Sequence, residues 1–379
     1  MVSVAVVGAG PAGLSVAINS QKAGWETVVI EEHPQVGIPV NCTGIISRSG
    51  VDELGLKISG ITVNAVRGAR IFSPNRQELQ VKRSETVAYV VERDKLDQKL
   101  ALEAQQAGVK IKTNTRLLDY RKETLFVESN GHGEILKSTV IVGADGPFSK
   151  TRSIMGIDVP KEKFVHAYQF RVKGNFDKNF VEVYLGDFAK GYFAWVVPEN
   201  EEMARIGLAV SGGSVRESFE HFSKKIGASG ERCDMCSKLI PTGEPLKEIV
   251  KGNAMLVGDA AFQTKGSTGG GIISGIKAGR ACAKAIDEYY KNKKPLSNYS
   301  NYVAELNKEL NLHWKIRKYL NSLSEQKIDG LFEKMKKSKT EEFLSEYGDM
   351  DKPSKFIGKI MTTPHMWRLV PDFLAFMRK

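Results

Sequence analysis

Apolar and polar positions follow two different periods along this chain of 379 residues. Near the N-terminus, an apolar β-branched run over residues 2–7 enters a glycine-rich turn, and the apolar segment 14–18 follows, which predicts strand, turn and helix. A second apolar strand is expected over 26–30. Over residues 165–209 the period changes to two, which predicts antiparallel strands with one packed face. The pattern therefore indicates an α/β lobe followed by a β-rich lobe.

The rest of the chain continues this alternation of helices and strands. We expect a helix from Lys95 to Ala107, with Asp94 as its N-cap and Gly108 after its end. Further elements are expected as strands at 109–112, 117–120, 124–128, 135–142 and 254–257, and as helices at 215–230, at 272–290 and after Pro295. Between the helix at 215–230 and the strand at 254–257, a loop is expected through Pro241 and Pro245.

The first turn has the spacing Gly-x-Gly-x-x-Gly, which is typical of a dinucleotide site. Gly8 permits the tight turn, Gly10 allows close approach of a pyrophosphate, and Gly13 lets the helix pack on the strand. The helix that begins near Pro11 and Ala12 presents unpaired N–H groups and a partial positive charge to the phosphates.

An acidic pair, Glu31 and Glu32, ends the second strand, at the distance where a carboxylate meets the ribose hydroxyls of an adenosine. Glycine-rich turns recur far downstream, after apolar strands, where doubly wound sheets bind ligands. They contain Asp145 with Gly146, Gly258 with Asp259, and Gly269, Gly270 and Gly271 before Ile272.

The charge balance points to anionic partners, since the formal net charge is +11. Phosphorylated metabolites, an anionic membrane face and a lysine-rich solvated surface stay open; no nucleic-acid module is evident, so we expect no nucleic-acid partner. No apolar run of eighteen or more residues and no signal peptide is evident, so we expect a cytoplasmic protein, with peripheral contact at the inner membrane face left open. The segment 361–379 mixes large apolar and basic residues, as an interfacial segment would, or it packs back onto the body.

The four cysteines are too few for a disulfide framework. Cys233 and Cys236 have the spacing of half a zinc site or of a redox pair in a loop, but nothing completes a metal shell, and inert thiols are favoured. We expect no metal. Cys282 lies in a helical pattern and is interpreted as a core residue.

The order of these landmarks over about residues 1–290 resembles flavoproteins of the p-hydroxybenzoate-hydroxylase type. The resemblance implies that the dinucleotide is FAD. It also implies that Arg93 and the backbone near Asp145 and Gly146 approach the diphosphate side, and that Asp259 binds the ribityl chain. The backbone over 269–272 would then lie at the pyrimidine edge of the flavin.

Within this group, two segments resemble the geranylgeranyl reductase family, which saturates isoprenoid double bonds. The first is the loop Pro39-Val40-Asn41-Cys42-Thr43-Gly44-Ile45. The second is Tyr192-Phe193-Ala194-Trp195-Val196-Val197-Pro198, followed by Gly207. Val197 and Ala209 depart from the family pattern, and no acidic residue stands between Cys42 and Gly44.

The resemblance implies an FAD-dependent reductase of C=C bonds in geranylgeranyl chains, with an isoprenoid lipid as substrate. Cys42 would stand near the reacting carbons as a proton donor, or be a small core residue. Tyr192, Phe193, Trp195, Pro198 and Gly207 would bind the prenyl chain, or belong to the core. The electron donor would be ferredoxin or NAD(P)H.

Other activities of this fold stay open. A flavin halogenase has a Trp-x-Trp-x-Ile-Pro strand, which residues 193–198 match only in part. An aromatic hydroxylase, a carotenoid cyclase and a membrane electron-transfer flavoprotein are further alternatives, although the last would need four cluster cysteines.

The expected fold class is α/β, with a Rossmann-like FAD-binding domain, an inserted antiparallel β-sheet substrate domain and a helical C-terminal region. The FAD-binding domain is expected over residues 1–60, 85–155 and 245–295. The substrate domain is expected over 61–84 and 156–244, and the helical region over 296–379.

Overall fold

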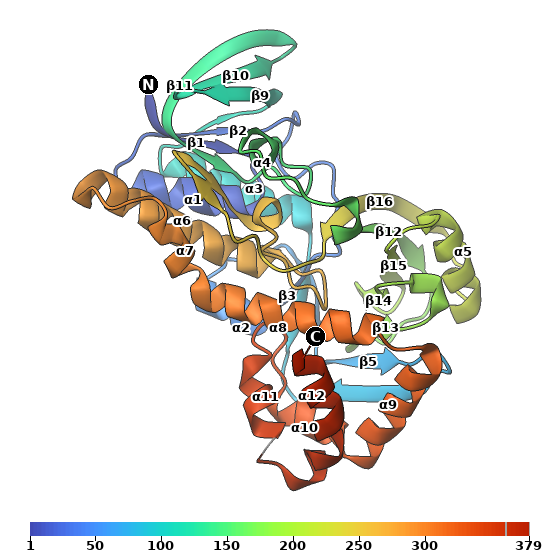
Figure 1. Ribbon diagram of the computed structural model, residues 1–379. Coiled ribbons are helices and arrows are strands. Elements are labelled where there is room, and N and C mark those ends of the chain that lie inside the picture. Colours follow the sequence, from blue (N-terminus) through green and yellow to red (C-terminus); the bar gives the residue numbers. More distant parts are fainter. Residues whose placement is uncertain (361, 379) are drawn as a thin grey trace.

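An eight-stranded sheet forms the centre of the first lobe in the computed structural model, which describes residues 1–360 and 362–378 (Figure 1). Its main order is β17 (Val250–Lys251), β18 (Ala254–Leu256), β11 (His132–Gly143), β1 (Val2–Val7), β2 (Thr27–Ile30) and β8 (Lys110–Lys112). The five strands from β18 to β8 run parallel, and β9 (Thr115–Arg121) and β10 (Thr124–Ser129) extend β11 as an antiparallel hairpin.

Two helices far apart in the sequence pack in direct contact on this sheet. They are α1 (Pro11–Lys22) and α6 (Ile272–Asn292). The Ser15 hydroxyl donates to the carbonyl of Ile276 at 2.8 Å, and a Cβ at Gly279 would lie only 2.6 Å from the carbonyl oxygen of Ala12. The distant glycine segments therefore share one lobe because small residues let the two helix backbones approach.

The helix α3 (Arg93–Gln106) begins earlier than expected. Its N-cap is Glu92, whereas Asp94, which we predicted as the cap, lies in the first turn. An acidic residue in the first turn favours a helix start as an N-cap does, because the N-terminal end of the helix dipole is positive. The short α4 (Lys150–Ile154) follows β11.

A second, seven-stranded sheet forms the other lobe, and α5 (Val215–Ile226) covers its outer face with Phe219 and Phe222 (Figure 1). Its order is β16 (Arg232–Pro241), β12 (Phe164–Lys173), β15 (Met203–Val210), β14 (Ala194–Pro198), β13 (Phe180–Tyr184), β5 (Gly68–Phe72) and β6 (Glu78–Lys82). The strand β16 corrects our expectation of a loop there; it was missed because its residues are largely polar and only partly buried.

A small sheet of β3 (Ile45–Ser47), β7 (Ala88–Val91) and β4 (Thr62–Val66) lies between the lobes, next to α2 (Arg48–Leu54). Short helical turns complete the lobes at η1 (Lys161–Lys163), η2 (Asp187–Ala189) and η3 (Gly258–Ala261).

The C-terminal region is helical, as expected, and packs below both lobes (Figure 1). It comprises α7 (Asn298–Tyr302), α8 (Ala304–Asn321), α9 (Glu325–Lys337), α10 (Thr340–Tyr347), α11 (Ser354–Ile360), η4 (Pro364–Leu369) and α12 (Val370–Arg378). In the segment 361–379, of which residues 361 and 379 lie outside the described part, Met366 and Leu369 are buried against Phe343 and Ile360. This part of the segment packs back onto the body. Across residues 1–360 and 362–378, no helix combines the length and the apolar character needed to cross a membrane.

Candidate functional site

One cavity of 880 Å³ extends between the two lobes. One part of it is lined by the glycine segments of the first lobe, and another by apolar side chains of the second sheet and of the C-terminal region. The lining includes Gly10, Gly258, Gly269, Gly270, Gly271, Cys42, Phe193, Trp195, Val181, Val183, Leu344, Met350 and Phe356. Segments from residue 10 to residue 356 therefore meet around a single space.

The three fingerprint glycines have different surroundings. A Cβ at Gly8 would lie 2.4 Å from the carbonyl oxygen of Ala144, and one at Gly13 would lie 2.1 Å from the carbonyl oxygen of Gly8. No atom lies within 4 Å of a Cβ built at Gly10. Gly10 is the N-cap residue of α1, and no side chain caps this end of the helix. The backbone N–H groups there face open space, which is the surface that a diphosphate group requires.

Glu31 lies beside this loop at the end of β2. Its Oε2 accepts a hydrogen bond from the backbone N–H of Ala9 at 2.8 Å, and its Oε1 contacts Nδ1 of His33 at 2.6 Å. The carboxylate is thus tied to the fingerprint turn itself. Glu32, the second acidic residue that we predicted here, is exposed.

Asp145 does not direct its carboxylate into the cavity. The carboxylate accepts hydrogen bonds from the Ser149 hydroxyl at 2.5 Å and from the backbone N–H of Thr151 at 2.9 Å. It therefore holds the N-terminus of α4, whereas its neighbours Ala144 and Gly146 line the cavity. At this turn it is the neighbouring residues, rather than the acidic side chain, that face a ligand.

Arg93 is buried at the start of α3, between Asp97 and the Cys42 thiol. One of its terminal nitrogens donates to Asp97 at 2.5 Å, and its Nε is buried without a partner among the described residues. Burial opposes the charge, but Asp97 and Cys42 together raise the pKa of Arg93 above its ordinary value. A permanent cation therefore lies next to the thiol.

Asp259 faces the cavity together with a cation that the sequence did not suggest. Lys238, on β16 of the second sheet, places Nζ 2.9 Å from Asp259 Oδ2, and the Thr264 hydroxyl donates to Oδ1 at 3.1 Å. Burial favours the neutral acid, but Lys238 and Thr264 hold the pKa of Asp259 below its ordinary value. Asp259 in turn raises the pKa of Lys238, so both groups stay charged.

The glycines before α6 come close to this pair. A Cβ at Gly271 would lie 2.9 Å from Asp259 Oδ1, and one at Gly269, whose φ is +73°, would lie 2.9 Å from the Tyr192 hydroxyl. No side chain caps the start of α6 at Ile272. This second uncapped helix terminus presents a partial positive charge beside the cavity.

The helix α8 supports the same loop from behind. Arg317, fully buried, donates to the carbonyls of Tyr192 at 3.0 Å and Ser267 at 2.8 Å, and lies 4.5 Å from the centre of the Tyr192 ring. Burial lowers its pKa to about 10. On the same helix, Nδ1 of His313 contacts the Ser267 hydroxyl at 2.6 Å.

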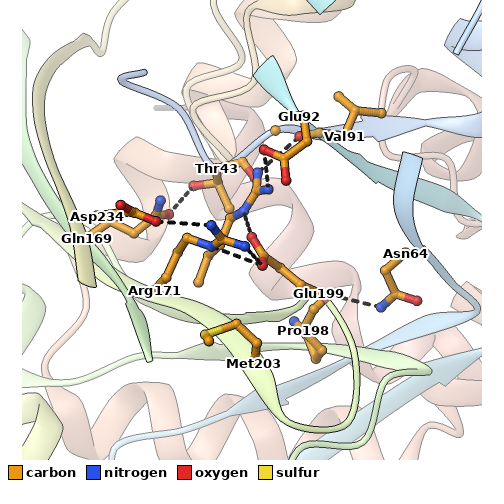
Figure 2. Close-up of polar contacts among 12 residues, drawn as sticks. Thr43, Asn64, Val91, Glu92, Gln169, Arg171, Pro198, Glu199, Met203 and Asp234 are labelled. Carbon is orange, nitrogen blue, oxygen red and sulfur yellow. Dashed lines mark hydrogen bonds and ion pairs between the residues drawn. The ribbon is translucent and has the colours of Figure 1, made fainter. Parts of the chain in front are cut away.

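The Cys42 loop is fixed by a buried polar network on the second sheet (Figure 2). Arg205 donates to the carbonyl of Thr43 at 2.7 Å and pairs with Glu199 at 2.5 Å. Glu199 also pairs with Arg171 at 2.5 Å. The Cys42 sulfur accepts a hydrogen bond from the backbone N–H of Gly44 at 3.3 Å. The sequence signal for this network is Arg205 itself, a charged residue within an otherwise apolar strand.

The residues predicted to bind substrate divide into two groups. Tyr192, Phe193 and Trp195 line the cavity, whereas Pro198 and Gly207 are not among its lining residues. A Cβ at Gly207 would lie 2.6 Å from the Trp195 ring, so Gly207 makes room for that ring. Pro198 ends β14, and its carbonyl accepts from the Asn64 amide.

The other cysteines have separate environments. Cys233 is exposed, and Cys236 lines the cavity, where burial raises its pKa to about 11. Both lie on β16 rather than in a loop, and both are free thiols. Cys282 is fully buried in α6. Among the described residues, no group of three or more His, Cys, Asp or Glu residues is arranged to hold a metal ion.

Comparisons with known proteins agree with this geometry. The family model of the FAD binding domain matches residues 1–226. The chain is 30% identical over 395 aligned positions to the digeranylgeranylglycerophospholipid reductase of Methanocaldococcus jannaschii, and the match covers 98% of each chain. It is 29% identical to digeranylgeranylglycerophospholipid reductase 1 of Methanothermobacter thermautotrophicus, over 88% of this chain and 90% of the relative.

Solved structures show the same fold. A geranylgeranyl bacteriochlorophyll reductase-like protein from Thermoplasma acidophilum superposes with a TM-score of 0.86 at 24% identity, over 98% of each chain. A flavin-dependent brominase superposes with a TM-score of 0.72 at 17% identity, over 95% of this chain and 98% of that one. The expected α/β fold class and the expected cofactor, FAD, are thereby confirmed. Its sequence relatives and its FAD-binding fold show that the chain belongs to the geranylgeranyl reductase family of FAD-dependent oxidoreductases.

Proposed function

We propose that this enzyme uses reduced FAD to saturate C=C bonds in the geranylgeranyl chains of membrane ether lipids. The observation that carries the proposal is the continuity of the cavity, which joins the glycine segments to a wall of aliphatic and aromatic side chains. An apolar wall of this kind suits a prenyl chain, because burying its hydrocarbon surface is favourable. The named activity of the two archaeal relatives supports the same substrate class.

The protein's own residues divide the work as follows. When bound, reduced FAD supplies a hydride to one alkene carbon. An isolated alkene is a poor hydride acceptor, so the other carbon must receive a proton. Cys42 lines the cavity and its Sγ is oriented by the N–H of Gly44, which makes it the proton donor in this proposal. Phe193 and Trp195 hold the chain and exclude water.

The rim of the cavity supports a substrate with an anionic headgroup. Arg67 and Lys82 line the cavity and are exposed, and they lie close together, since Arg67 directly precedes Gly68, which pairs with Lys82 on the neighbouring strand. Among residues 1–360 and 362–378, neither side chain is paired with a carboxylate. Phosphate oxygens are strong acceptors for such cations. We therefore propose a phosphate-bearing lipid, with its chains in the cavity and its headgroup at Arg67 and Lys82.

Peripheral contact with the membrane belongs to the same proposal. Trp367 and Leu374, in the C-terminal segment, are 58% and 49% exposed, and the positive net charge favours an anionic surface. Co-sedimentation with anionic vesicles, and none with neutral vesicles, would support this contact. Electrons would come from reduced ferredoxin or NAD(P)H, which separate anaerobic assays with each donor can distinguish.

The decisive experiment reduces the purified holoenzyme chemically without oxygen and then adds a geranylgeranyl glycerophospholipid. Hydride and proton addition predicts a mass gain of about two units for each saturated bond. Incorporation of oxygen or of halide would instead assign a monooxygenase or a halogenase, and unchanged mass would reject the reductase proposal. Cys42→Ser tests the proton donor separately: undiminished turnover would remove Cys42 from the mechanism.

A further inference from the structure

We propose that Gln169 is a positioning residue, which fixes the Cys42 loop against the Trp195 ring of the cavity wall. The inference rests on the proposed function insofar as Cys42 takes part in the reaction. The geometric claim concerns the loop alone and can be tested without any substrate. Neither the fingerprint nor the family pattern identifies Gln169, which lies in the middle of β12.

The side-chain oxygen of Gln169 joins two structural elements. Its Oε1 accepts a hydrogen bond from the Thr43 hydroxyl at 2.7 Å (Figure 2). It accepts another from Nε1 of Trp195 at 2.9 Å. An indole N–H can only donate, so it requires the amide oxygen on this side. The amide nitrogen then points to the Cys236 sulfur, at 3.6 Å. Both acceptor sites of the oxygen are used, and the amide has one orientation.

The loop has little freedom on its other side. Thr43 directly follows Cys42, and its carbonyl is held by Arg205 at 2.7 Å. Gly44 has a φ of +76°, and a Cβ there would lie 2.3 Å from the carbonyl oxygen of Val91. The backbone after Cys42 is therefore fixed by Arg205, while the Thr43 side chain is fixed by Gln169. Breaking the hydrogen bond between Thr43 and Gln169 therefore frees the Thr43 side chain, which lies next to the Cys42 thiol. The hydrogen bond from Arg205 to the Thr43 carbonyl stays in place.

Burial makes this contact worth more than a surface hydrogen bond. Gln169 is 5% exposed and Trp195 is 7% exposed, so water does not replace a lost partner at low cost. A residue that only filled space at this position would need no amide, because an aliphatic side chain avoids the desolvation of polar atoms. The Gln169 amide, hydrogen-bonded to both Thr43 and Trp195, therefore serves to position the Cys42 loop against the cavity wall.

The test compares Gln169→Leu, Thr43→Val and the double variant as FAD-loaded proteins, without substrate. Each is treated with iodoacetamide, and the alkylation rates of Cys42 and Cys233 are followed by peptide mass spectrometry. Exposed Cys233 is the internal reference. We expect each single variant to increase the Cys42 rate about fivefold, the factor for one lost hydrogen bond. The Cys233 rate should not change.

The double variant decides whether the two residues act through the same bond. If they do, its Cys42 rate equals that of the single variants, because the bond can be lost only once. Additive effects, or Cys42 rates within twofold of the wild type in both single variants, would overturn the proposal. Should Gln169→Leu fail to retain FAD, Thr43→Val alone still tests the bond from the loop side.

Turnover gives the functional readout. With lipid substrate, Thr43→Val should lower kcat while KM stays within about twofold, because this variant leaves the hydrogen bond between Gln169 and Trp195 in the chain-binding wall in place. An increased Cys42 alkylation rate with no change in kcat would leave Gln169 as a loop anchor and reject Cys42 as the donor. The failure of the proposed function is thus distinguishable from the failure of the positioning role.

Discussion

The ammonium group of Lys238 lies 2.9 Å from Asp259 Oδ2, and this ion pair connects an edge strand of the second sheet to the glycine segment of the first lobe. The pair lies at the cavity, where Lys238 retains 34% side-chain exposure and Asp259 retains 18%. The first lobe and the second sheet are therefore joined by an ion pair at the cavity.

Lys238→Met should destabilise the protein, because the largely buried Asp259 carboxylate would keep only the Thr264 hydroxyl as a hydrogen-bond partner. A hydrogen bond to a charged group is worth about 1.5–3 kcal/mol, and we expect a loss in this range by urea denaturation. The matched control is Lys247→Met at an exposed position, which should stay within about 0.5 kcal/mol of the wild type. Equal stabilities of the two variants would contradict a role for the pair.

Gly10→Val should separate cofactor binding from folding. No atom lies within 4 Å of a Cβ at Gly10, so the FAD-free protein should retain its stability. The new side chain occupies the space where the diphosphate approaches, and we expect FAD affinity to fall at least about tenfold. Flavin absorbance after gel filtration measures retention.

Gly13→Ala provides the contrasting variant, since its Cβ would lie 2.1 Å from the carbonyl oxygen of Gly8. Here the FAD-free protein itself should lose about 1–3 kcal/mol, the usual cost of overpacking. If Gly10→Val unfolded as readily as Gly13→Ala, the open space at Gly10 would not be a binding surface.

Arg205→Met should be among the most destabilising substitutions in the second lobe. It leaves Glu199, which is 3% exposed, with Arg171 as its remaining partner and removes the donor to Thr43. Loss of one partner of a buried pair costs about 3–5 kcal/mol. The double variant Arg205→Met with Glu199→Leu should recover part of this loss, as measured by denaturant midpoint; no recovery would show that the backbone contacts dominate.

The sequence predicted the fingerprint turn and its helix because their signals are local: glycines at fixed spacing and the apolar runs beside them. The start of α3 was displaced by two residues because both Glu92 and Asp94 favour a helix start. Gln169 could not be assigned, because its partner Thr43 is 126 residues away and an amide within a strand carries no motif. Likewise, the strand that carries Lys238 was missed because its polar residues face the cavity and the surface rather than a core.

Acidification should weaken the protein through His313. Burial, with Lys265 nearby, lowers the pKa of His313 to about 3, whereas an unfolded histidine has a pKa of about 6.5. Between these values the unfolded chain binds one more proton than the native chain, so stability falls as the pH falls, by up to about 1.4 kcal/mol per unit.

His313→Gln should therefore lose less stability than the wild type between about pH 7 and about pH 5, as measured by urea midpoints. His132→Gln, at an exposed position, is the control and should follow the wild type. Identical slopes for the wild type and His313→Gln would show that His313 has the same pKa in the native and unfolded states, which would contradict the prediction.

The order in which the cavity walls occur along the chain has a consequence for biosynthesis. Every glycine segment of the cofactor end precedes residue 273, whereas the wall residues of the C-terminal region begin only at Leu344. Chains emerge from the ribosome N-terminus first, and domains generally fold as units during synthesis. A nascent chain can thus complete its nucleotide-binding lobe while the cavity still lacks the wall that the C-terminal region supplies. A product truncated before α10 would display that apolar interior to chaperones and proteases.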